Sequence, residues 1–118
     1  MPQTSWTPPG NSPWGVPDHQ EQISNGVWDI STPSHGGIMV YKTIAELNLT
    51  PEALAIGERF GSFYCYEEDC NWAIPLFEQP LWLKALAEKN ENVVEEITQY
   101  VMDVLNRWHK SYLGGRSI

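Results

Sequence analysis

The chain has 118 residues, of which 42% are hydrophobic, and its 15 acidic and 7 basic side chains give a formal net charge of −8. This apolar content is typical of a folded domain, and a chain of this length supports one modest core rather than two. The acidic balance disfavours binding to nucleic acid or to an anionic membrane, and no apolar run approaches the roughly 20 residues of a membrane span.

The amino terminus has neither the cationic nor the apolar part of a secretion signal, so we expect a cytoplasmic protein. In a reducing cytosol Cys65 and Cys70 are expected to be thiols rather than a disulfide. No cofactor is indicated, and the oligomeric state is left open.

Residues 1–18 are predicted to form an extended arm, and residues 19–118 a single α+β domain. Six of the nine prolines fall by position 33, and the run from Pro8 to Pro13 excludes a helix or a central strand. The arm carries Trp6 and Trp14. Docking of these rings on the core is favoured over contact with a partner, because large rings are usually buried.

The Asn25-Gly26 pair predicts a β-hairpin, in which both residues supply the positive φ angles of a tight turn. In the strand that follows, Trp28 and Ile30 share one face, with Val27, Asp29 and Ser31 on the other. The apolar run 38–41 predicts a further strand, and the aromatic run 62–66 predicts another.

Short helices are predicted after Thr43, whose spacing to Glu46 suits a capping box, and after Thr50, where Pro51 suits the first helical turn. Gly57 is the expected end of the second helix. The acidic residues 67–69 are expected to begin a helix that Pro75 keeps short or bent.

A short amphipathic turn is predicted over 81–87, and Asn90 or Asn92 is expected to cap a long helix that runs to Leu113. Apolar residues recur there at intervals of three and four, and Gly114-Gly115 ends the segment. Strands in the first half and helices in the second predict an α+β fold, a small antiparallel sheet packed against the long C-terminal helix.

Two stretches, residues 31–37 (STPSHGG) and 66–72 (YEEDCNW), resemble a small uncharacterised family of bacterial, plasmid and phage proteins. Those proteins carry similar S-T-x-S-H-G-G and Y-E-E-D-C-x-W motifs, and Trp14 to Pro17, Glu21 to Ile23 and Arg107 to His109 also look similar. The resemblance implies no activity. It implies only a place on mobile elements, among genes that act on host systems.

If the two motifs meet in space, His35 could approach the acidic cluster and Cys70. Histidine, thiol and carboxylate together can form a metal site or a nucleophile with its base. The candidate residues are His35, Glu67, Glu68, Asp69 and Cys70. A structural role, in which His35 bonds a carboxylate and locks the turn, is favoured over catalysis, and no metal site is predicted because close-spaced ligand pairs are missing. His19 and His109 are interpreted as surface residues.

The terminal helix carries an acidic stripe in which Glu91, Glu95 and Asp103 lie four or eight residues apart, with Glu96 nearby. Successive carboxylates about 6 Å apart could mimic a nucleic-acid backbone toward a basic partner. An ordinary solvated face is the favoured interpretation of the stripe.

Two functions are therefore compared. The first is a phage or mobile-element accessory protein, in the host cytoplasm, that binds and inhibits a host protein with a basic surface, a nucleic-acid-handling defence component, without catalysis. Its candidate contacts are Glu91, Glu95, Glu96, Asp103, Trp6 and Trp14. The second is a small hydrolase or transferase built on His35, Cys70 and the cluster from Glu67 to Asp69. We favour the first.

Overall fold

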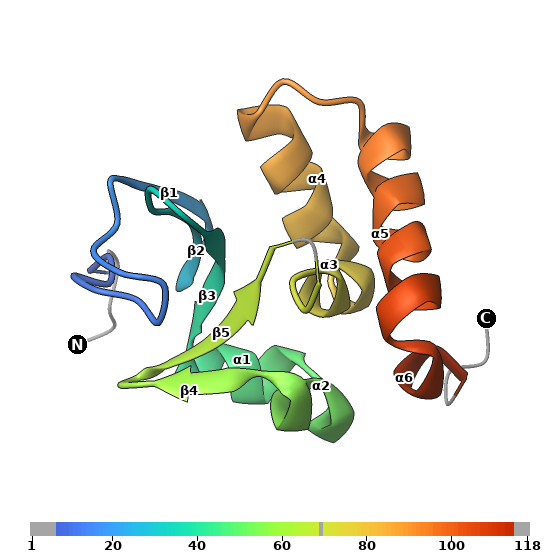
Figure 1. Cartoon of the computed structure of the whole chain (residues 1–118), viewed down its shortest axis with the longest axis horizontal. Coiled ribbons are helices and arrows are strands. Elements are labelled where there is room, and N and C mark those ends of the chain that lie inside the picture. The colour runs from blue at the N-terminus through green and yellow to red at the C-terminus, as the bar shows by residue number, and fades with distance from the viewer. Residues whose placement is uncertain (1–6, 69, 115–118) are drawn as a thin grey trace.

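The computed structural model describes residues 7–68 and 70–114, over which the chain forms five strands and six helices (Figure 1). The strands form one antiparallel sheet with the order β1-β2-β3-β5-β4. Their bounds are His19–Ser24 (β1), Val27–Ser31 (β2), Gly36–Tyr41 (β3), Glu58–Phe60 (β4) and Phe63–Glu67 (β5). The predicted α+β class is confirmed, and β4 is an addition that the sequence analysis did not predict.

The helices connect the strands and then complete the chain. Their bounds are Lys42–Asn48 (α1), Pro51–Ile56 (α2), Ala73–Glu78 (α3), Pro80–Lys89 (α4), Val94–Trp108 (α5) and Lys110–Gly114 (α6). The long helix α5 packs against α3 and α4, and these two helices contact β5 and β1. The terminal helix therefore reaches the sheet largely through α3 and α4.

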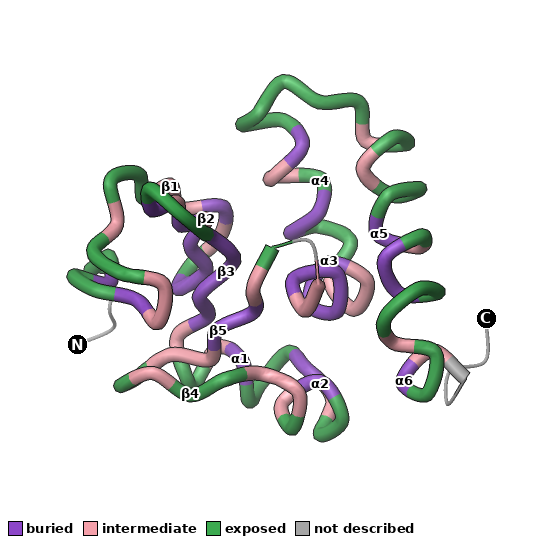
Figure 2. The backbone as a smooth tube through the Cα atoms, viewed as in Figure 1, coloured by how far each residue is buried: buried purple, intermediate pink, exposed green. Residues whose placement is uncertain are grey.

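The sheet has a different apolar cluster on each face. On the helix side Val27, Ile38, Val40 and Tyr66 join the main core with residues of α3, α4 and α5. On the other side Trp28, Ile30, Met39 and Cys65 form a smaller cluster, against which Trp14 packs from the segment before β1. Figure 1 shows this segment and the helices on opposite sides of the sheet, and Figure 2 shows many of the buried residues in the central strands and in α3.

Local signals identified some helix ends correctly. Thr50 caps α2 by accepting a hydrogen bond from the Ala53 N–H, with Pro51 at the first helical position and Gly57 at the end, as predicted. The capping box at Thr43 is wrong. Helix α1 begins two residues earlier than this box implies, at Lys42 directly after β3, and the Lys42 N–H donates to the Ser62 carbonyl. In the hairpin only Gly26 has a positive φ, so Asn25 does not share the predicted geometry.

The predicted start of the long helix is also wrong. Residues 90–92 close helix α4: Glu91 has a left-handed backbone (φ 58°), and the Asn92 N–H donates back to the Ala87 carbonyl at 2.8 Å. This arrangement satisfies a carbonyl at the end of α4. Helix α5 therefore begins only at Val94. The helix also ends before Leu113, because the chain departs from helical geometry at His109 and resumes in α6.

Candidate functional site

The two sequence motifs lie side by side in the sheet. Strands β3 and β5 pair Gly37 with Glu67, and the Glu68 N–H donates to the Gly36 carbonyl at 2.9 Å. His35 Nδ1 lies 3.2 Å from Glu67 Oε2, which confirms that His35 meets the acidic segment. The side chains remain 58% and 45% exposed. Asp69 lies outside the described residues, so its predicted part in the site is not placed.

Packing accounts for much of the first motif. A Cβ atom on Gly36 would lie 2.5 Å from the Ile30 carbonyl oxygen, and one on Gly37 would lie 2.6 Å from Cη2 of the Trp14 ring. Both distances are too short for a side chain. The Thr32 hydroxyl closes the turn by accepting from the His35 N–H at 3.1 Å. The glycines are thus required by close backbone and ring approach.

Cys70 has a different neighbour from the one predicted. Its Sγ lies 3.8 Å from Nε2 of His109, and the same ring nitrogen lies 3.2 Å from the Cys70 carbonyl oxygen. His109 is half-buried, so its interpretation as a surface residue is wrong. Burial, and secondarily the charge of Glu67, raise the pKa of the Cys70 thiol. These contacts divide the composite site, with His35 at Glu67 and Cys70 at His109.

The helix predicted to start in the acidic segment begins later, at Ala73, and its first turn holds no acidic residue. Glu67 instead ends β5, because its backbone pairs with β3. The Trp72 N–H donates to the Glu67 carbonyl and closes the turn between them. Cys70 therefore precedes helix α3 and does not lie in its first turn.

A cleft of about 310 Å³ opens between the sheet and the helices α4 and α5. Its polar wall includes Asp29, Glu68 and Asn90, and its apolar wall includes Trp72 and Ile97. Burial raises the pKa of Asp29, although a hydrogen bond from the Asn90 side chain opposes this shift. The cleft thus has a carboxylate in its wall whose charge is only partly compensated.

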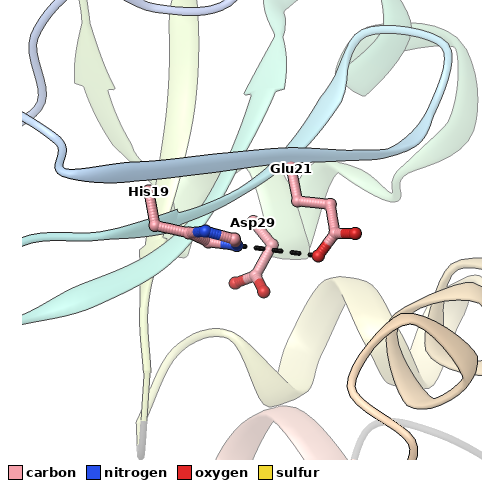
Figure 3. Close-up of side chains that lie close together, drawn as sticks. All are labelled: His19, Glu21 and Asp29. Carbon is pink, nitrogen blue, oxygen red and sulfur yellow. Dashed lines mark ion pairs between the residues drawn. The ribbon is translucent and has the colours of Figure 1, made fainter.

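Next to this cleft, His19, Glu21 and Asp29 project from the same face of the β1–β2 hairpin (Figure 3). One possible ligand atom from each lies within 4.8 Å of the others, and His19 Nε2 is 3.6 Å from Glu21 Oε1. Among the residues that the structure describes, it is the one group of three or more His, Cys, Asp or Glu side chains whose possible ligand atoms lie this close together. The sequence analysis missed it and treated His19 as an isolated surface residue.

A β-bulge assembles this cluster. Ser24 pairs with Val27, but the next pair is Gln22 with Trp28, so Ile23 is an extra residue in β1. A regular ladder from Ser24 would place Gln22 opposite Asp29, whereas the bulge places Glu21 there. A shift of one residue exchanges the two faces of a strand. The bulge therefore brings His19 and Glu21 to the face of Asp29, and the His-x-Glu alternation in β1 was the available sequence signal.

The proposed partner surface is only partly assembled on α5. Glu95, Glu96 and Asp103 are exposed on this helix, but Glu91 lies in the turn before it and leaves the predicted stripe. Trp14 is half-buried against the small cluster, as expected for docking, and Trp6 lies outside the described residues. A groove of about 380 Å³ follows one side of the helix. It is lined by Tyr100, Asp103, Val104, Arg107 and Trp108.

This α+β domain belongs to a family that is defined by sequence. Residues 7–116 match the family described as a domain of unknown function (DUF7007), so the chain is a member of that family. No match was found among curated proteins or among solved structures. Across residues 7–68 and 70–114, no helix has the length and apolar character needed to cross a membrane.

Proposed function

We propose that this chain is a small acidic domain, encoded by a phage or another mobile element, that binds a host protein with a basic surface and performs no catalysis. The exposed side of α5 carries the proposal. Tyr100 and Trp108 are 41% and 61% exposed and line the same groove, together with Asp103. Large aromatic rings at such positions are frequent energetic anchors of protein interfaces.

Charge supports a basic partner. The chain carries a net charge of −8, and Glu95 and Glu96 extend the acidic character of α5 toward its amino terminus. Complementary charges raise the rate of association and help to exclude wrong partners. Arg107, which is itself basic, lines the same groove. Because the groove is not uniformly acidic, the aromatic rings would supply most of the affinity, and the carboxylates would mainly raise the rate of association.

The resemblance of residues 31–37 and 66–72 to phage and plasmid proteins supports a more specific proposal. The partner would be a nucleic-acid-handling component of host defence, which presents a basic groove for its substrate. An acidic domain seated in that groove would exclude nucleic acid and inhibit the host protein. The predicted catalytic site has less support, because His35 pairs with Glu67 rather than with Cys70, and because burial raises the pKa of the Cys70 thiol.

The experiment begins with affinity capture from the host and identification by mass spectrometry, and then measures binding kinetics with the purified partner. Trp108→Ala should raise the dissociation rate, since it removes a proposed anchor. Glu95→Lys with Asp103→Lys should slow association, and the difference from wild type should shrink as salt increases. The matched control reverses Glu46 and Glu88, which are exposed elsewhere and give the same change in net charge.

The two charge-reversed double variants distinguish binding through the α5 surface from a general effect of net charge. Equal slowing by both charge reversals would leave the net charge as the only determinant and remove α5 from the proposal. Unchanged dissociation of Trp108→Ala would remove the aromatic anchor. Inhibition is tested separately, by competition between this chain and nucleic acid for the purified partner.

A further inference from the structure

The cluster of His19, Glu21 and Asp29 stands apart from the α5 surface and has no part in the proposed function. It lies on the β1–β2 hairpin, on the face that looks toward α4 (Figure 3). Glu21 and Asp29 are directly opposite each other in the register, and His19 is two residues from Glu21 on the same strand face. The three side chains therefore converge from two adjacent strands.

This placement is unfavourable without a cation. Two carboxylates directly opposite each other on neighbouring strands repel, and both Glu21 and Asp29 are half-buried. The chain supplies partial compensation: Lys89 Nζ lies 3.9 Å from Glu21 Oε2, His19 Nε2 lies 3.6 Å from Glu21 Oε1, and the Asn90 side chain donates to Asp29. The bulge that creates this repulsion is itself a departure from regular pairing, and bulges are concentrated next to functional sites.

We propose that His19, Glu21 and Asp29 bind a divalent transition-metal ion of the Zn²⁺ or Mn²⁺ kind. An imidazole nitrogen with two carboxylate oxygens suits these ions, whereas Ca²⁺ and Mg²⁺ favour ligand sets made of oxygen alone. Bonds of about 2.0–2.2 Å would require those donor atoms that are farthest apart, at up to 4.8 Å, to approach one another by roughly 1 Å. His19 is exposed and Glu21 lies on the edge strand, so small side-chain rotations can supply this movement.

The cleft gives the bound ion access to a further ligand. Three protein ligands leave coordination positions open, as in catalytic rather than structural metal sites. Asp29 belongs both to the cluster and to the wall of the 310 Å³ cleft. An ion held there would therefore lie beside a space large enough for water or a small polar ligand.

The test is calorimetric titration of the metal-free full chain with Zn²⁺, and in parallel with Mn²⁺. We expect saturable one-to-one binding and a rise in the melting temperature with ion concentration. His19→Ala should lower the affinity about tenfold or more, because it removes the imidazole ligand. This exposed substitution is expected to leave the fold intact, which circular dichroism of the metal-free variant checks.

Two controls make the assignment specific. His35→Ala removes another exposed imidazole that lies near a carboxylate, and it should leave the affinity unchanged. Cys70→Ser removes the thiol near His109, where Zn²⁺ could bind instead, and it should also leave the affinity unchanged. Lys89→Gln should raise the affinity, since it removes a competing positive charge near Glu21.

Several results would overturn the proposal. These are binding that does not saturate, an affinity that His19→Ala leaves unchanged, and a loss that follows Cys70→Ser or His35→Ala instead. Because none of these measurements uses the α5 partner, the metal proposal can fail while the proposed function survives, and the converse also holds.

Discussion

The sheet carries two arrangements of histidine and carboxylate, and they differ in how they are built. His35 and Glu67 come from two conspicuous motifs, yet they form one exposed pair at the end of β3 and β5. His19, Glu21 and Asp29 come from an ordinary hairpin sequence, yet they converge as three possible ligands beside a cleft. The glycines of the conspicuous motif are explained by close packing of the backbone. The less conspicuous β1–β2 hairpin instead brings three possible metal ligands together.

The largest effect that would test this contrast is expected at Gly37. Its side-chain position is occupied by the Tyr66 backbone and by the Trp14 ring, so Gly37→Ala should destabilise the fold by about 2–4 kcal/mol. Urea unfolding measures the change. Gly10→Ala is the control, because a Cβ atom there meets nothing within 4 Å. Equal stabilities of the two variants would contradict the structural explanation of the motif.

Much of the fold could be predicted because its signals are local. The turn at Gly26, the strand runs that contain Ile38 and Cys65, and the Thr50-Pro51 start of α2 each depend on residues close in sequence. The same holds for the period of α5, since apolar residues at intervals of three and four identify a helix wherever its ends lie.

The remaining features depend on contacts between distant segments. Helix α1 begins at Lys42 rather than after Thr43, and the Lys42 N–H is satisfied by the Ser62 carbonyl, twenty residues away. The cluster of His19, Glu21 and Asp29 depends on the bulge at Ile23. A two-residue hairpin turn predicts a regular register, and a regular register puts Glu21 and Asp29 on opposite faces. The pairing of Cys70 with His109 spans 39 residues and carries no local signal.

An intermediate effect is expected at Asp29, whose carboxylate is half-buried and, to a smaller extent, repelled by Glu21 on the opposite strand. Asp29→Asn removes one of two directly opposed carboxylates and should stabilise the metal-free protein by about 0.5–1 kcal/mol at neutral pH. Burial raises the pKa of Asp29 above 3.8, so the folded state binds the proton more tightly than the unfolded state. Stability is then lost as the pH rises from about 4 through the folded pKa.

The advantage of Asp29→Asn over wild type should therefore be largest at neutral pH and vanish below about pH 4, where the carboxyl is protonated in both states. Urea unfolding of both proteins across this range, with a chelator present, measures the difference. Asp103→Asn makes the same chemical change at an exposed position and controls for the general loss of one negative charge. An advantage that persists in acid would show that the negative charge of Asp29 is not the cause.

The smallest effect is expected at the exposed motif pair. His35 and Glu67 are 3.2 Å apart but mostly in water, and such pairs contribute between about 0 and 1 kcal/mol. A double-mutant cycle with His35→Ala and Glu67→Gln should give a coupling free energy below about 0.5 kcal/mol. Added salt should reduce it further, because exposed charges are screened. A coupling well above 1 kcal/mol that resists salt would reverse the comparison. It would mean that the two motifs hold this pair in a protected, preorganised arrangement, and His35 would again become the leading candidate for chemistry.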